Sequence, residues 1–279
     1  GCAGALAAPY QGGMARNMMI DDIEADIAEL GLLEDDEILL DEAALLLGLA
    51  DHPDADIDDA RAEIDAMTAR IEALGGLGGP SRLQAERLAH TIAHRCGLRG
   101  DREDYDNPAN ADFLAMFERR RGLPVTLSIL YVALARRLGG AADIVGLPGH
   151  VVVRIGDGGD AVVIDPFSDG GIINRPASEL RDPVREGVQL SNRAALVRLL
   201  TNQAARAHNA GDLDRALVLA RRMTMIAPDF SSVWWERAQL EQRLGDDAAA
   251  RESLVAMRET TRDANLQTRI DATLAGLAR

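Results

Sequence analysis

Cysteine is scarce in this chain of 279 residues, which contains only Cys2 and Cys96. So small a number excludes a disulfide framework and favours a reducing compartment, so we expect a cytoplasmic protein. Long apolar runs are also missing, because the longest blocks are short pieces such as residues 44–50. A membrane helix needs about 18 or more apolar residues, and we therefore expect no membrane-spanning segment.

Basic charge is in deficit as well. The chain has 30 Lys and Arg residues against 45 Asp and Glu residues, which gives a net charge of −15 and a pI near 4.7. Direct binding to nucleic acid rests on basic side chains that neutralise phosphates, so the charge argues against it. The chain also has no P-loop, no G-x-G-x-x-G after a strand and no closed Cys/His set, and we expect neither a cofactor nor a metal.

The first half of the chain predicts a tail and several helices. Residues 1–18 lack the charged start of a signal peptide and are expected to be a disordered tail or a tag remnant. Residues 19–74 are acidic, and their apolar residues recur at the three- and four-residue spacing of a helix face. This segment predicts three helices, which end near residues 32, 52 and 74. The glycine-rich residues 75–80 are either a domain boundary or a loop inside one α-rich domain.

Residues 81–97 predict an amphipathic helix that carries His90 and His94 one turn apart, with Cys96 nearby. Two His residues at this spacing can share a metal ion, but no third ligand with zinc-like spacing follows. We interpret these histidines as partly buried, hydrogen-bonded side chains.

A further helix is predicted from Pro124 to Gly139, and its apolar residues occupy nearly all sides, as in a central buried helix. Two strands follow, in residues 141–155 and 160–167, joined by a glycine-rich turn. His150 follows Pro148-Gly149, where a strand begins, and Asp165 lies at the end of the second strand. An antiparallel pair places them approximately opposite each other, so that Asp165 can hydrogen-bond His150 Nδ1.

This order of helix, His and Asp is the one with which thiol enzymes orient an imidazole toward a nucleophile at a helix start. The alternative is that the pair only ties two strand ends together. The nucleophile position is occupied by Val125 and Thr126 instead of Cys. Thr126 or Ser128 would need His150 as a base and an oxyanion hole, and otherwise they cap the helix. Cys96 is a weaker candidate, because Gly97 after it indicates a helix end.

The arginines at positions 119–121 form a basic cluster near the expected cleft. They either attract an acidic peptide or a carboxylate, or pair with neighbouring acids such as Glu118, Asp101 and Asp104.

Residues 190–279 predict a helical repeat. The sequences GDLDRA and GDDAAA begin at residues 211 and 245, a separation of 34 residues that is typical of tetratricopeptide repeats. Small residues allow close helix packing, and we expect Trp234 or Trp235 to pack between the units. With only two units, the array is a brace with a modest binding surface or, alternatively, a peptide groove.

Several ordered segments carry a family resemblance: residues 52–67, 98–113, 118–139, 146–155 and 164–173. On these motifs the chain resembles a bacterial family of invasion-gene regulators with transglutaminase-like and tetratricopeptide-repeat domains. The resemblance implies that His150 and Asp165 are the second and third members of a Cys-His-Asp triad. Its Cys position falls at Thr126 or Val125, where the family commonly has a hydroxyl residue.

The predicted fold is α+β: a helical N-terminal segment with a papain- or transglutaminase-like core in residues 19–185, followed by repeats in 190–279. Two functions remain open. The first is a non-catalytic regulator or adaptor that binds a protein or peptide through the repeats or the cleft. The second is a hydrolase or transferase of amide chemistry that uses Thr126 or Ser128 with His150 and Asp165.

Overall fold

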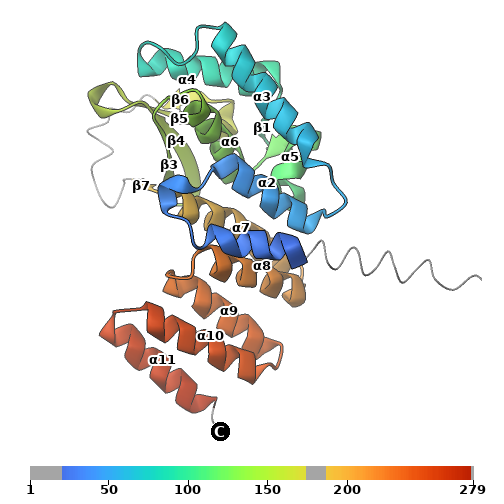
Figure 1. Cartoon of the computed structure of the whole chain (residues 1–279), viewed down its shortest axis with the longest axis vertical. Coiled ribbons are helices and arrows are strands. Elements are labelled where there is room, and N and C mark those ends of the chain that lie inside the picture. Colours follow the sequence, from blue (N-terminus) through green and yellow to red (C-terminus); the bar gives the residue numbers. More distant parts are fainter. Residues whose placement is uncertain (1–20, 174–186, 278–279) are drawn as a thin grey trace, which may run out of the picture.

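The structure, a computed structural model, describes residues 21–173 and 187–277, so the predicted tail lies outside the described residues. The described chain is mostly helical with a small antiparallel sheet, as the α+β prediction required (Figure 1). Residues 21–30 are helical, and the helices that follow are α2 (Leu40–Asp51), α3 (Ile57–Ala73), α4 (Ser81–Ala89), α5 (Phe113–Arg119), α6 (Pro124–Arg137), α7 (Asn192–Asn209), α8 (Leu213–Ile226), α9 (Ser231–Arg243), α10 (Asp247–Thr260) and α11 (Ala264–Gly276).

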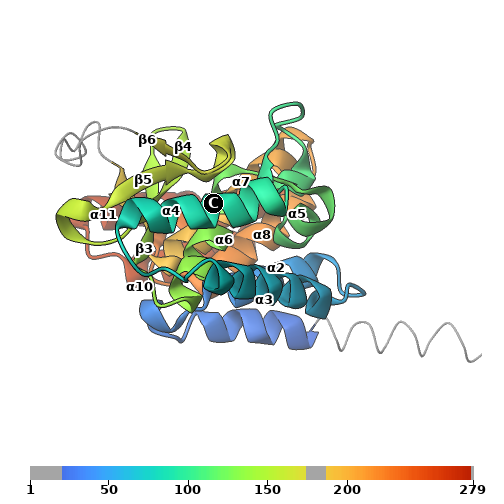
Figure 2. The same cartoon turned by 90° about the horizontal axis from the view of Figure 1, so that it is seen from above.

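Helix α6 is the centre of the core. All its residues from Pro124 to Ala135 are buried, because the sheet covers one side and α2 and α3 cover the other (Figure 2). Each fully buried Leu or Ile side chain contributes roughly 2 kcal/mol through removal of apolar area from water. The predicted central helix is therefore confirmed.

The main sheet has the strand order β6-β5-β4-β3-β7 and is antiparallel throughout. Its strands are β3 (Ala142–Leu147), β4 (His150–Ile155), β5 (Val162–Asp165), β6 (Gly171–Ile173) and β7 (Val188–Gln189), and a separate parallel pair is formed by β1 (Arg99–Gly100) and β2 (Arg121–Gly122).

The first of the two predicted strands is in fact a hairpin. It turns at Pro148-Gly149, where Gly149 adopts a φ of 72° that side-chain-bearing residues rarely tolerate. In the β4–β5 register, Val153 pairs with Ile164. Continued by one step, this register places Asp165 opposite Val152, so Asp165 lies diagonally from His150, not directly opposite it.

The C-terminal helices stack in chain order as two hairpins, α7–α8 and α9–α10, followed by α11 (Figure 1). Gly211 and Gly245 make the equivalent turns with φ values of 81° and 83°, which explains the repeated glycine in the sequence. Trp234 lies between the units, and its indole nitrogen donates a hydrogen bond to the Pro228 carbonyl.

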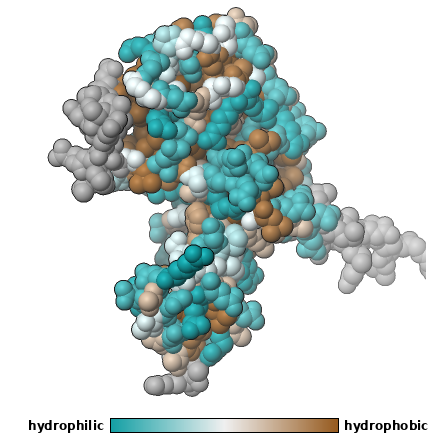
Figure 3. Space-filling model, turned by 60° about the vertical axis from the view of Figure 1, so that its left-hand side comes forward, coloured by the Kyte–Doolittle hydropathy of each residue, from teal (hydrophilic) through white to brown (hydrophobic). Residues whose placement is uncertain are grey.

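One apolar core extends from Ile23 to Leu240 and includes residues on both sides of 75–80 and of 185–190. Residues 75–80 thus connect two parts of the chain that contribute to the same core. A second, smaller core joins α9, α10 and α11, which form the narrower lobe at the bottom of Figure 3. Within residues 21–173 and 187–277, we find no helix with the length and apolarity needed to cross a membrane.

Candidate functional site

The His150–Asp165 pair lies where β4 begins and β5 ends. His150 Nε2 is 3.1 Å from Asp165 Oδ1, and the two side chains are 32% and 18% exposed. The predicted use of Nδ1 is wrong in this detail. Asp165 faces Nε2, and the Nδ1 atom has no hydrogen-bond partner among the described residues.

Asp165 also organises the turn that follows β5. Its Oδ1 accepts a hydrogen bond from the Phe167 backbone at 3.0 Å, and its Oδ2 accepts one from the Ser168 hydroxyl at 2.8 Å. Arg102 donates in turn to the Ser168 hydroxyl at 3.1 Å. The carboxylate is thus fixed by the turn and can both orient the imidazole and tie the end of β5 to its loop.

A row of aromatic contacts connects His150 with the helical array. The His150 ring meets Phe167 edge to face, with ring centres 6.4 Å apart, and Phe167 meets Tyr105 in the same way at 5.7 Å. The Arg206 guanidinium of α7 lies 5.8 Å from the Tyr105 ring centre. Such contacts contribute about 1 kcal/mol each, so His150 is held against residues that pack on α7.

The predicted hydroxyl nucleophiles are buried within α6. Thr126 has no exposed surface, and its hydroxyl donates a hydrogen bond to the Asn110 carbonyl at 2.9 Å. It does not cap the helix, as one interpretation expected, since the N-cap position is Leu123. Ser128 is equally buried and its hydroxyl has no partner among the described residues. Neither hydroxyl is hydrogen-bonded to His150, and Val125 is buried beside them.

Cys96 lies at the end of a helical segment, as predicted. It follows a π-helix, His90–Arg95, which continues α4. Its sulfur accepts a hydrogen bond from Arg70 Nη1 at 3.4 Å, and burial raises the pKa of the thiol. A protonated thiol is a poor nucleophile, and no hydrogen bond joins it to His150.

The interpretation of His90 and His94 as partly buried is wrong, because both are exposed. Their ring centres are 6.4 Å apart, and neither ring has a hydrogen-bond partner among the described residues. Nowhere in residues 21–173 and 187–277 do three His, Cys, Asp or Glu residues come close enough together to hold a metal ion.

Two of the clustered arginines are paired with carboxylates. Arg119 bonds Asp101 at 3.2 Å, Arg120 bonds Glu63, and Arg121 donates to the Arg120 carbonyl at 3.0 Å. This agrees with the alternative in which these arginines pair with acidic residues. The sequence did not indicate Glu63, which lies 57 residues before Arg120.

A cavity of about 800 Å³ lies among α7, α8, α9 and α10. Its polar lining includes Glu236, His208 and Arg243, and Arg243 contacts the His208 ring. Burial raises the pKa of the Glu236 carboxyl, while nearby His208 acts in the opposite direction. Sequence reasoning placed a binding surface on this array but did not identify these residues.

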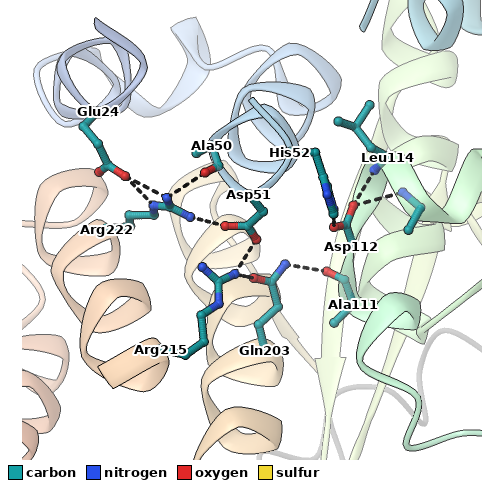
Figure 4. A network of polar contacts seen from close by, with 11 residues as sticks. Glu24, Ala50, Asp51, His52, Ala111, Asp112, Leu114, Gln203, Arg215 and Arg222 are labelled. Carbon is teal, nitrogen blue, oxygen red and sulfur yellow. Dashed lines mark hydrogen bonds and ion pairs between the residues drawn. The ribbon is translucent and has the colours of Figure 1, made fainter. Parts of the chain in front are cut away.

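A second His–Asp pair, also missed from the sequence, joins α2 to α5 (Figure 4). His52 Nε2 is 2.6 Å from Asp112 Oδ2, and the other oxygen of Asp112 caps α5. The neighbouring Asp51 binds Arg215 and Arg222 of α8. His52 and Asp112 are 60 positions apart in the sequence, so no local signal indicates this contact.

Comparisons with known proteins show what this chain is similar to. The sequence pattern described as the transglutaminase-like superfamily matches residues 58–208. A UPF0162 protein of Xylella fastidiosa (strain 9a5c) is 28% identical over 244 residues, which cover 81% of this chain and 85% of the relative. F-box only protein 21 of Mus musculus is 35% identical over 82 residues, 29% of this chain and 13% of that protein. A crystal structure of menin, said to reveal the binding site for Mixed Lineage Leukemia (MLL) protein, aligns with 86% of this chain and 69% of its own at 12% identity and a TM-score of 0.42.

Proposed function

The chain belongs to the transglutaminase-like superfamily, and from this premise we propose that it is a non-catalytic regulatory or adaptor protein that binds another protein or peptide. The observation that carries the proposal is the position of the Thr126 hydroxyl, which is buried and committed to the Asn110 carbonyl. A nucleophile needs contact with its base, and within residues 21–173 and 187–277 no hydroxyl or thiol is hydrogen-bonded to His150.

In this proposal the C-terminal helices are tetratricopeptide-like repeats and supply the binding surface. The 34-residue spacing of Gly211 and Gly245 supports the repeat assignment, and the cavity of about 800 Å³ supports a peptide site. The partner binds in the cytoplasm, and any effect on gene expression passes through this protein partner, because the net charge of −15 disfavours direct contact with nucleic acid.

The alternative is amide chemistry by a hydrolase or transferase that uses Thr126 or Ser128. It is favoured by one observation, the accessible His150 whose Nε2 faces Asp165 and whose Nδ1 has no partner among the described residues. For this chemistry, the start of α6 would have to rearrange to bring a hydroxyl to that atom.

Panning of a random peptide library against the full chain tests the first proposal. Peptides that bind should lose at least tenfold in affinity when Ala205→Trp fills the cavity, since Ala205 is an exposed residue of its lining. Ala66→Trp, at an exposed position of α3, is the matched control and should bind normally. Thr126→Val and His150→Gln should also keep binding.

A parallel screen with amide, ester and transamidation substrates tests the alternative. Turnover that disappears in both His150→Gln and Thr126→Val, with the fold intact, would establish the enzyme and overturn the proposal. Peptide binding that ignores Ala205→Trp would also argue against the repeat surface.

A further inference from the structure

A second cavity, of about 450 Å³, lies between the end of α3 and the π-helix His90–Arg95. It is separate from His150 and from the cavity in the helical array. Its lining consists of Arg70, Ala73, Leu74, His90, Thr91, His94 and Arg95. Every titratable side chain in this lining is basic, in a chain whose net charge is −15.

The two arginines of this cavity have no carboxylate partner among the described residues. Among residues 21–173 and 187–277, the one hydrogen-bond partner of the Arg70 side chain is the Cys96 sulfur, at 3.4 Å, and Arg95 forms no ion pair. The raised pKa of Cys96 keeps this thiol neutral at physiological pH, so it does not compensate the Arg70 charge. Elsewhere, arginines such as Arg137 and Arg222 are each bound to two or more acids.

Thr91 adds an unused donor to the cavity lining. Its side chain is 1% exposed, and its hydroxyl has no hydrogen-bond partner in the described parts of the chain. Buried hydroxyl groups are nearly always hydrogen-bonded, because an unpartnered one costs about 1–3 kcal/mol. Thr91 is part of the cavity lining, so a rotation about its Cα–Cβ bond would let a ligand there satisfy this group.

The π-helical winding brings the basic residues to one side. The Cys96 backbone N–H bonds the Thr91 carbonyl at 3.0 Å, five residues back. In an α-helix, Arg95 would be rotated by about 140° from His90, whereas the wider π turn reduces this rotation. Single π turns occur often at functional sites, and here the turn assembles His90, His94 and Arg95 around one cavity.

We propose that this cavity binds a small phosphate-bearing molecule. Guanidinium groups bind phosphate through two parallel hydrogen bonds, and two of them, with two imidazoles and the Thr91 hydroxyl, suit a dianion better than a single carboxylate. The volume lies in the range typical of small-molecule sites, about 300–1,000 Å³. The chain has no Lys, so all 30 of its Lys and Arg residues are arginine, the side chain with this geometry.

Isothermal titration calorimetry of the full chain with inorganic phosphate, pyrophosphate and glycerol 3-phosphate, at constant ionic strength, tests the proposal. We expect saturable binding at one site. Arg70→Gln and Arg95→Gln should each lower the affinity about tenfold or more, as expected for loss of a charged hydrogen bond. Both residues are exposed, so these variants should fold normally.

Arg251→Gln provides the matched control, because Arg251 is an exposed arginine of α10 at the far end of the molecule. It changes the net charge equally and should leave phosphate binding unaltered. Thr91→Val should weaken binding while the unfolding temperature without ligand stays the same or rises. The proposal is overturned if none of the phosphate compounds binds saturably, or if the Arg70→Gln/Arg95→Gln double variant binds them as tightly as the wild type. A chain that binds citrate but not the phosphate compounds would also overturn it.

Discussion

The Thr126 hydroxyl and the Asn110 carbonyl are joined by a hydrogen bond of 2.9 Å, which fastens the first turn of α6 to the 3-10 turn Pro108–Ala111. The same carbonyl accepts the Leu123 backbone N–H at 2.8 Å. Asn110 itself is fully buried, and its side chain accepts a hydrogen bond from Arg119 at 2.6 Å. The Thr126 hydroxyl, which stands where the nucleophile was expected, therefore fixes the start of α6.

Replacement of Thr126 by Val should therefore affect stability and not binding. We expect the free energy of unfolding to fall by about 1 kcal/mol, the usual contribution of one buried hydrogen bond. The Asn110 carbonyl keeps its bond from Leu123, which limits the loss. Urea denaturation measures the change. Ser128→Ala, which removes a buried hydroxyl without a described partner, is the control and should cost less.

Tyr131 predicts a dependence of stability on alkaline pH. Burial raises the pKa of its phenol above the ordinary value of 10.0, and Asp169 and Asp165 act in the same direction. In the unfolded chain the phenol loses its proton near pH 10, whereas the folded chain retains it. The stability is therefore complete below that pH and falls above it, by about 1.4 kcal/mol per pH unit.

The variant Tyr131→Phe isolates this effect. At neutral pH it should be as stable as the wild type or more stable by about 1 kcal/mol, because the buried hydroxyl has no partner in the described chain. The difference between the two proteins should then grow in favour of the variant as the pH rises above 10, measured by denaturation at several pH values. A difference that stays constant with pH would show that the phenol titrates normally.

Gly170 predicts a steric effect beside the candidate site. Its φ is 73°, and a Cβ there would come within 2.5 Å of the Ala89 Cβ and 2.8 Å of the Tyr131 hydroxyl. We expect Gly170→Ala to cost more than about 2 kcal/mol, from the backbone strain and the clash together. Gly139→Ala is the control, since φ is 71° there but no atom lies within 4 Å, so strain alone applies. Equal unfolding free energies for the two variants would contradict this account.

Parts of the fold with a local cause were predictable. The apolar residues on all sides of α6 indicated a helix buried by its neighbours, and Gly211 and Gly245 marked two equivalent turns. The hairpin at Pro148-Gly149 was missed because apolar residues continue through both of its strands. The edge strands β6 and β7 are too short to leave a pattern.

The candidate site was predictable only in outline. The nearness of His150 and Asp165 follows from strand order, but no sequence pattern indicates that Nε2 is the ring nitrogen that faces Asp165. The Thr126 contact with Asn110 spans 16 residues, and periodicity says nothing about it. The π-helix at 90–95 has the composition of an α-helix, so its winding is decided by tertiary contacts that the sequence does not display.

Arg222 is the residue whose removal should most weaken the attachment of the N-terminal helices to the array. Its guanidinium, 4% exposed, bonds Glu24 at 2.8 Å and the Ala50 carbonyl at 3.1 Å, and it also binds Asp51 (Figure 4). In Arg222→Ala the largely buried Asp51 would keep only Arg215 as a cationic partner. Removal of one partner from a buried ion pair typically costs about 3–5 kcal/mol, and we expect a loss in this range.

The matched variant for this prediction is Arg82→Ala. Arg82 pairs with Glu86 at 3.1 Å, but the two side chains are 62% and 52% exposed, so the loss should stay below about 0.5 kcal/mol. Urea denaturation of both variants measures the difference, and hydrogen exchange should show faster opening of residues 21–30 and α2 in Arg222→Ala only. Since burial shields the Arg222 ion pairs from salt, the loss should persist at high ionic strength. Similar losses in the two variants would mean that apolar packing alone holds the N-terminal helices against α8.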